Sequence, residues 1–143
     1  MRFTALLLLV LALGGLAWVR LAPSDPARWH VNPLTERDPV SPNFARIAPG
    51  EIVTPEDPAT LAARIDAALL AMPRVTRLAG EPEGGFVTYV ARSAVLGFPD
   101  YVTVRTLSAD RGATFAALSR ARFGRSDFGV NAARMQALRA ALE

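Results

Sequence analysis

The sequence predicts an α+β fold: an antiparallel sheet of about four strands with two helices packed on one face, preceded by an N-terminal transmembrane helix. Three observations support this. Residues 3–19 form an uncharged apolar run. Beyond residue 57, stretches with apolar side chains at alternate positions lie between two stretches in which apolar side chains recur every three or four positions. Short turns separate the alternating stretches, which is typical of an antiparallel meander covered by helices.

Residues 1–22 are predicted to be a membrane anchor. As a helix, the 17 residues of 3–19 would be about 25 Å long, against about 30 Å for the hydrocarbon core of a bilayer. Arg2 and Arg20 flank this run and can extend their charges to the interfaces. No small-x-small cleavage site follows the run, so we expect an uncleaved anchor; a signal peptide cut near Ala22 is the alternative.

Residues 23–56 are predicted to form a proline-rich tether. Eight of the eleven prolines lie between residues 23 and 58, and proline fixes its own φ and keeps the preceding residue extended. We therefore expect no long helix or strand in this segment, although apolar side chains such as Trp29 can dock on the domain. His30 is the only histidine. A lone histidine in a linker is more often structural than catalytic, and we expect no catalytic role for it.

The α+β domain is predicted to occupy residues 57–143. Asp57 and Pro58 form a typical helix start, the apolar stripe that follows continues to Met72, and Pro73 ends the helix. The last helix is expected to begin at Asn131 as its N-cap, with Val130 and Met135 as a hydrophobic staple. Strands are expected at residues 74–79, 86–96, 101–107 and 115–123, joined by Gly- and Pro-containing turns.

Alternation along the three longer strands divides their side chains between two faces. The face expected to meet the core carries Val87, Tyr89, Ala91, Val95, Val102, Val104, Phe115, Ala117, Ala121 and Phe123. The opposite face collects Arg92, Arg105, Arg120 and Arg122, together with Thr88, Tyr101 and Thr103. Guanidinium groups bind phosphate and carboxylate bidentately, so this arginine face is a candidate anion-binding site. The alternative is a solvated face whose arginines pair with acidic residues or lie beneath the tether.

A signature follows in the last predicted strand and the turn after it. Ser119-Arg120-Ala121-Arg122-Phe123-Gly124, then Ser126-Asp127-Phe128-Gly129-Val130-Asn131, resembles the signature of the bacterial and plastid family known as domain of unknown function 1499. Further similarity lies in Ser41-Pro42-Asn43, Met72-Pro73-Arg74 and Phe98-Pro99-Asp100. The family has no agreed activity. The resemblance implies a fold and a location. The secretory character of residues 3–19 favours a cytoplasmic N-terminus, so we expect a single-pass protein of the bacterial inner membrane with its domain in the periplasm.

Within the signature, the expected roles are architectural. Ser119, Arg120 and Gly124 end the strand, while Ser126, Asp127, Gly129 and Asn131 form the turn into the helix. Asp127 precedes a helix whose first N–H groups lack intrahelical partners, so we expect its carboxylate to accept backbone hydrogen bonds. A small hydrolase that uses Asp127 and Ser126 is the less favoured alternative.

Composition narrows the function classes. Two of the 16 basic residues flank the apolar run, so the rest of the chain nearly balances its 13 acidic residues, and we expect no nucleic-acid partner. There is no cysteine, and no motif has metal-ligand spacing, so we expect no metal site and no cofactor. The domain also lacks histidine, the commonest general base. We therefore expect a non-catalytic binding or accessory module for an anionic lipid, a glycan or an envelope protein; a scaffold for another envelope protein is the alternative.

Overall fold

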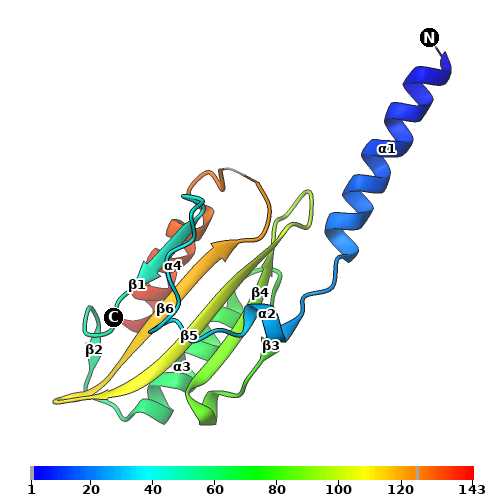
Figure 1. Ribbon diagram of the computed structural model, residues 1–143. Helices are drawn as coiled ribbons and strands as arrows, with labels where there is room; N and C mark the ends of the chain where they lie inside the picture. Colours follow the sequence, from blue (N-terminus) through cyan, green and yellow to red (C-terminus); the bar gives the residue numbers. More distant parts are fainter. Residues whose placement is uncertain (1, 125) are drawn as a thin grey trace.

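The computed structural model describes residues 2–124 and 126–143, and in this part of the chain the sheet has six antiparallel strands. Two helices, α3 and α4, cover one face of the sheet (Figure 1). The α+β class is confirmed, whereas the predicted counts of four strands and two domain helices are too low. The strands are β1 (Phe44–Ile47), β2 (Val53–Thr54), β3 (Val75–Ala79), β4 (Phe86–Arg92), β5 (Pro99–Ala109) and β6 (Gly112–Ala121). The helices are α1 (Arg2–Leu21), α2 (Pro26–Trp29), α3 (Pro58–Ala71), the short 3₁₀ helix η1 (Pro82–Gly84) and α4 (Val130–Leu142).

Helix α1 contains the apolar run and projects away from the domain (Figure 1). Its 20 residues give a length of about 30 Å, which matches the hydrocarbon core of a bilayer. The helix is long and apolar enough to cross a membrane, a property that anchors and signal sequences share.

Strands β4, β5 and β6 form the predicted meander, with β5 at the centre of the sheet. Strand β4 ends at Arg92, four residues earlier than expected, because Ser93 and Phe98 close a loop: the Ser93 N–H donates to the Phe98 carbonyl (3.0 Å) and the Ser93 Oγ accepts from the Phe98 N–H (2.9 Å). The core position expected for Val95 is therefore wrong; its side chain lies on this loop and is 81% exposed.

The two strands that sequence patterns did not predict come from the proline-rich segment. Strand β1 pairs with the C-terminal half of β6, and β2 pairs with its beginning, Val53 opposite Thr114. Together they cover an edge of β6 that would otherwise present unpaired N–H and C=O groups. The Thr114 hydroxyl joins the two pairings, because it accepts from the Gly50 N–H (2.8 Å) and donates to the Ile52 carbonyl (2.7 Å).

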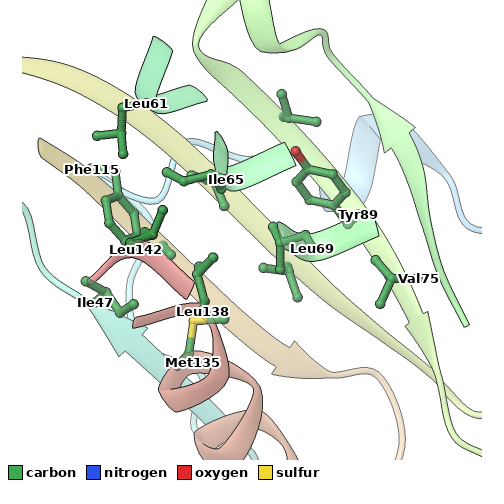
Figure 2. Packing of buried hydrophobic residues seen from close by; sticks show 14 of the residues in the cluster. Ile47, Leu61, Ile65, Leu69, Val75, Tyr89, Phe115, Met135, Leu138 and Leu142 are labelled. Atoms are coloured by element: carbon green, nitrogen blue, oxygen red, sulfur yellow. The ribbon is translucent and has the colours of Figure 1, made fainter. Parts of the chain in front are cut away.

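The core lies between the sheet and the two helices (Figure 2). Asp57 caps α3 as predicted, with its carboxylate accepting from the N–H groups of Ala59 (2.9 Å) and Thr60 (3.1 Å). The predicted strand parity is confirmed for Val87, Tyr89, Ala91, Val102, Val104, Phe115 and Ala117, which meet Leu61, Ile65 and Leu69 of α3 and Met135, Leu138 and Leu142 of α4. Ala121 and Phe123, expected in the core, are only half-buried, because β6 ends at Ala121. Each fully buried large side chain contributes about 1.5–3 kcal/mol.

Candidate functional site

The sheet face opposite α3 and α4 is covered by the chain's own segment 22–36. Tyr101, Thr103 and Arg120 point to this face, and each is less than 9% exposed. Trp29 at the end of α2 stacks on Tyr101, with ring centroids 3.9 Å apart and an angle of 12° between the rings. The linking segment, residues 22–36, which joins α1 to the domain, therefore packs on the face that was predicted to carry the arginines.

Three of the four predicted arginines donate to backbone carbonyls: two to the linking segment and one, Arg92, to the last turn of α1. Arg92 donates to the carbonyl of Arg20 (3.2 Å), and Arg122 to that of Pro23 (2.9 Å). Arg120 donates to the Trp29 carbonyl (3.4 Å), and its guanidinium lies 5.0 Å from the centre of the Trp29 ring. Guanidinium groups suit this role because their several donors are fixed in one plane.

The fourth arginine, Arg105, lies near the other end of the same face, 5.4 Å from the Phe86 ring centre. Arg120 also pairs with Glu36 (3.1 Å). The four arginines are thus distributed over this face and its edge rather than converging on one point. Their binding of an external anion stays a prediction.

His30 has a structural environment. Its ring stacks on Phe86 with centroids 3.9 Å apart, and its Nδ1 lies 2.9 Å from the Thr88 hydroxyl. Burial lowers the pKa of the imidazole, because the charged form would lose hydration. The Thr88 hydroxyl is in turn 3.1 Å from that of Thr103, which donates to the Trp29 carbonyl (3.4 Å). His30 therefore helps to fasten the linking segment to β4 and β5.

The signature turn joins β6 to α4, and Asp127 performs the capping there. Its carboxylate accepts from the N–H groups of Gly129 (3.1 Å) and Asn131 (3.0 Å). The predicted N-cap at Asn131 is wrong, as is the staple: α4 already begins at Val130, and the cap position belongs to Gly129, whose φ of 78° suits glycine. The prediction that Asp127 accepts backbone hydrogen bonds is confirmed.

Asn131 is instead a buried hub of side-chain hydrogen bonds, with 0% exposure. Its Oδ1 accepts from Ser119 (2.5 Å) and from Arg134 (2.8 Å), and its Nδ2 donates to the Asp127 carboxylate (2.8 Å) and to the Asn43 carbonyl (3.4 Å). Asn43 in turn donates to the carbonyl of Gly124 (2.9 Å). The signature thus ties together the end of β6, the start of β1 and the first turn of α4.

The pKa values of the two carboxyl groups near this turn, Asp127 and Asp100, are shifted in opposite directions. Burial by itself raises the pKa of Asp127. Hydrogen bonds from the side chain and backbone of Asn131 and from the Gly129 N–H have the opposite and larger combined effect, so the pKa lies below its ordinary value. Burial raises the pKa of Asp100, and the charge of Arg134 opposes this only in part. Ser126 uses its hydroxyl to accept from the Phe128 N–H (3.3 Å). Ser126 and Asp127 therefore shape the turn separately instead of forming a nucleophile–base pair.

Beside this turn lies an apolar groove of about 430 Å³. One wall is the β4–β5 loop, residues 93–98, and the other is the described part of the β6–α4 turn. Its apolar lining comes from Val95, Leu96, Phe98, Phe123, Phe128 and Val130, with Asp100 and Asp127 among the polar groups. This volume is in the range of small-molecule pockets. The predicted strands placed Val95 and Phe123 in the core, and for that reason the sequence did not indicate the groove.

A second cavity, the basic pocket, lies on the other side of the β4–β5 loop. It has a volume of about 340 Å³ and is lined by Arg20, Arg74 and Arg92, with Thr76, Ser93, Ala94 and Gly97. Within residues 2–124 and 126–143, none of the three arginines takes part in an ion pair. Arg92 is one of the arginines that the strand pattern predicted as anion-binding candidates, whereas Arg20 and Arg74 are not. Arg20 could have been recognised as a candidate because it lies next to the end of the apolar run. Arg74 could not, because its position depends on a left-handed φ of 60°.

A metal centre finds no support in the geometry. In the part of the chain that the structure describes, no three His, Cys, Asp or Glu side chains come together as a metal ion would require.

The fold and these sites define a class: an α+β protein with an apolar N-terminal helix whose sheet is strapped on one face by the segment that follows this helix. A family model described as "Protein of unknown function (DUF1499)" matches residues 21–142. The chain belongs to this family, as the signature suggested. The match begins where α1 ends and includes the linking segment, β1 and β2. No curated protein matches the chain.

Proposed function

We propose that this protein is a membrane-anchored, non-catalytic binding module whose basic pocket takes the phosphate group of an anionic lipid. The observation that carries the proposal is the convergence of Arg20, Arg74 and Arg92 on one pocket at the end of α1. A phosphate oxygen accepts hydrogen bonds from guanidinium donors, and the planar group can bind two oxygens at once. The proposed ligand is an anion, as expected from the sequence, but the proposed site lies at the edge of the sheet instead of on its face.

Two of the three guanidinium groups are partly held in place by backbone carbonyls. Arg92 Nη1 donates to the carbonyls of Arg20 (3.2 Å) and Gly97 (3.0 Å), and Arg74 Nε donates to the carbonyl of Arg92 (3.1 Å). A guanidinium has five N–H donors, so each of these two arginines has further donors for a ligand. Such preorganisation lowers the entropic cost of binding.

The position of the pocket favours a lipid over a soluble anion. Arg20 belongs to the last turn of α1, and arginines at the end of a membrane-spanning helix lie at the level of the lipid headgroups. Anionic lipids attract basic residues near the surface by about 1 kcal/mol each. The proposal includes a single-pass orientation in the bacterial inner membrane with the domain in the periplasm, for which the secretory character of residues 3–19 is the support. Cysteine labelling of intact cells with a membrane-impermeant maleimide, using an Asp110→Cys variant of this cysteine-free chain, tests that orientation.

The binding test compares Arg74→Gln/Arg92→Gln with a control, Arg37→Gln/Arg111→Gln, in the full chain. Both pairs remove two positive charges, and the control arginines are exposed and lie outside the pocket. In neutral detergent micelles titrated with phosphatidylglycerol, we expect the pocket variant to bind about 30-fold more weakly, from roughly 2 kcal/mol for two arginines. The control should bind like the parent. Equal affinities for the two variants would refute the proposal, and displacement of the lipid by millimolar inorganic phosphate would assign the pocket to free phosphate.

A further inference from the structure

The apolar groove has an unusually exposed rim. Phe128 is 95% exposed, Val95 81%, Val130 47% and Leu96 41%. Other exposed large apolar side chains beyond α1 in the described part of the chain are distributed among separate segments: Leu34, Val40, Val53 and Leu70. Single exposed apolar side chains are normal on a protein surface, whereas a cluster around a groove marks an interaction site.

The rim lies at the end of the sheet from which α1 departs. Figure 1 shows the β4–β5 loop and the β6–α4 turn on the side of the domain toward which α1 extends. Printed contacts agree: Arg92 Nη1 bonds the carbonyls of both Arg20 in α1 and Gly97 in the loop. At Gly97, a Cβ atom would lie 3.0 Å from Arg20 Nε, so the loop packs directly against the last turn of α1. Val95 and Leu96 on this loop are therefore close to the level at which α1 enters the bilayer.

The two carboxylates in the groove are compensated. Asp100 pairs with Arg134 (3.4 Å), and Asp127 accepts hydrogen bonds from Asn131 and Gly129. Asp100 has a cationic partner and Asp127 has three neutral N–H donors, which lowers the cost of desolvating the two carboxylates if hydrocarbon enters the groove.

We propose that the groove rim is embedded in the bilayer that α1 spans, and that the groove takes an acyl chain of a lipid in the same leaflet. Phe128 and Val95 enter the boundary between headgroups and hydrocarbon, as apolar side chains of interfacial segments do. The domain then has a second membrane contact besides α1. This inference requires α1 to span the membrane, as proposed above, but it does not require the basic pocket to bind a lipid.

Because the chain has no cysteine, single labels can be placed cleanly. The full chain carries Phe128→Cys or Val95→Cys with an environment-sensitive fluorophore, in nanodiscs of phosphatidylcholine with nitroxide-bearing acyl chains. Val53→Cys is the matched control: it is also apolar, is 50% exposed, and belongs to β2, outside the groove. We expect acyl-chain nitroxides to quench labels at 128 and 95 several-fold more than the label at 53, with blue-shifted emission at the two groove positions.

Quenching at 128 and 95 that is no stronger than at 53 would overturn the inference. The inference would also be overturned if the label at 128 were shielded from water only in nanodiscs that hold two copies of the protein. The Arg74→Gln background separates this inference from the basic pocket, because Arg92 keeps its bonds to Arg20 and Gly97 there: quenching is expected to persist while the affinity for phosphatidylglycerol falls. If the labels at 128 and 95 are not quenched in the parent background while phosphatidylglycerol still binds, the embedded groove is refuted and the basic pocket is not.

Discussion

Asn131→Ala should destabilise the protein far more than the loss of a helix cap. The side chain is fully buried and makes hydrogen bonds to four residues: Ser119, Arg134, Asp127 and Asn43. An exposed N-cap asparagine would cost about 1 kcal/mol on truncation to alanine. The variant therefore distinguishes a hub of the turn from an ordinary cap.

The magnitude follows from the partners. Two of the four bonds involve charged groups, each worth about 1.5–3 kcal/mol, and two are neutral, each worth about 1 kcal/mol. Part of this is recovered, because Ser119 keeps its bond from Arg134 (3.0 Å) and Asp127 keeps the backbone N–H of residue 131 (3.0 Å). We expect a net loss of about 3–4 kcal/mol, which corresponds to a fall in melting temperature of about 10 °C or more.

The assay is thermal and denaturant unfolding of the full chain in detergent, followed by near-ultraviolet circular dichroism. Gln136→Ala, an exposed change on α4, is the control and should alter stability by less than about 0.5 kcal/mol. Asp127→Ala and the double variant complete a cycle, in which we expect a coupling of about 1 kcal/mol or more between residues 127 and 131. A loss near 1 kcal/mol for Asn131→Ala, with no coupling, would refute the hub and leave only a cap.

Three further predictions concern the linking segment, the acid limit and the N-terminus. Trp29→Ala should cost about 3–5 kcal/mol, because Trp29 stacks on Tyr101; a loss below 1 kcal/mol in denaturant unfolding would contradict the seating of the segment. The lowered pKa of Asp127 means that its ionised form stabilises the fold at pH values above the unfolded pKa, and that this stability is lost as pH falls through the folded pKa. The stability gap between the parent and Asp127→Asn should therefore narrow from pH 6 to pH 3, and a constant gap would show that the carboxylate is not stabilised. Intact mass should show a chain that keeps residues 1–22, and a mature protein beginning near Ala22 would end the anchor prediction.

Local signals were sufficient for the start of α3 and for the faces of the long strands. Asp57 followed by Pro58 set the start of α3, and alternation from Phe115 to Ala121 assigned the sides of β6, because capping and pleating depend on near neighbours in sequence. Such patterns report what a segment can form by itself. They do not report what it pairs with.

The missed strands and the basic pocket depend on contacts distant in sequence. Strand β1 has only four residues and pairs Phe44 with Arg120, so the density of prolines around it was the stronger local signal. The arginines of the sheet face were assigned to the correct side, yet two of them, Arg120 and Arg122, bond carbonyls of the segment that crosses this face. The basic pocket joins Arg20 to Arg74 and Arg92, and only the path of the chain brings them together.

The short connection between α1 and the sheet limits how far the domain can travel. Pro23 and Ser24 are already held, by Arg122 and Tyr101, and α2 starts at Pro26. Even fully extended, the few residues from Leu21 to Pro26 span less than about 20 Å. This connection is therefore too short to let the domain move far from the end of α1. With α1 in the bilayer, as proposed, the domain stays close to the bilayer surface, and its binding partners have to reach that surface.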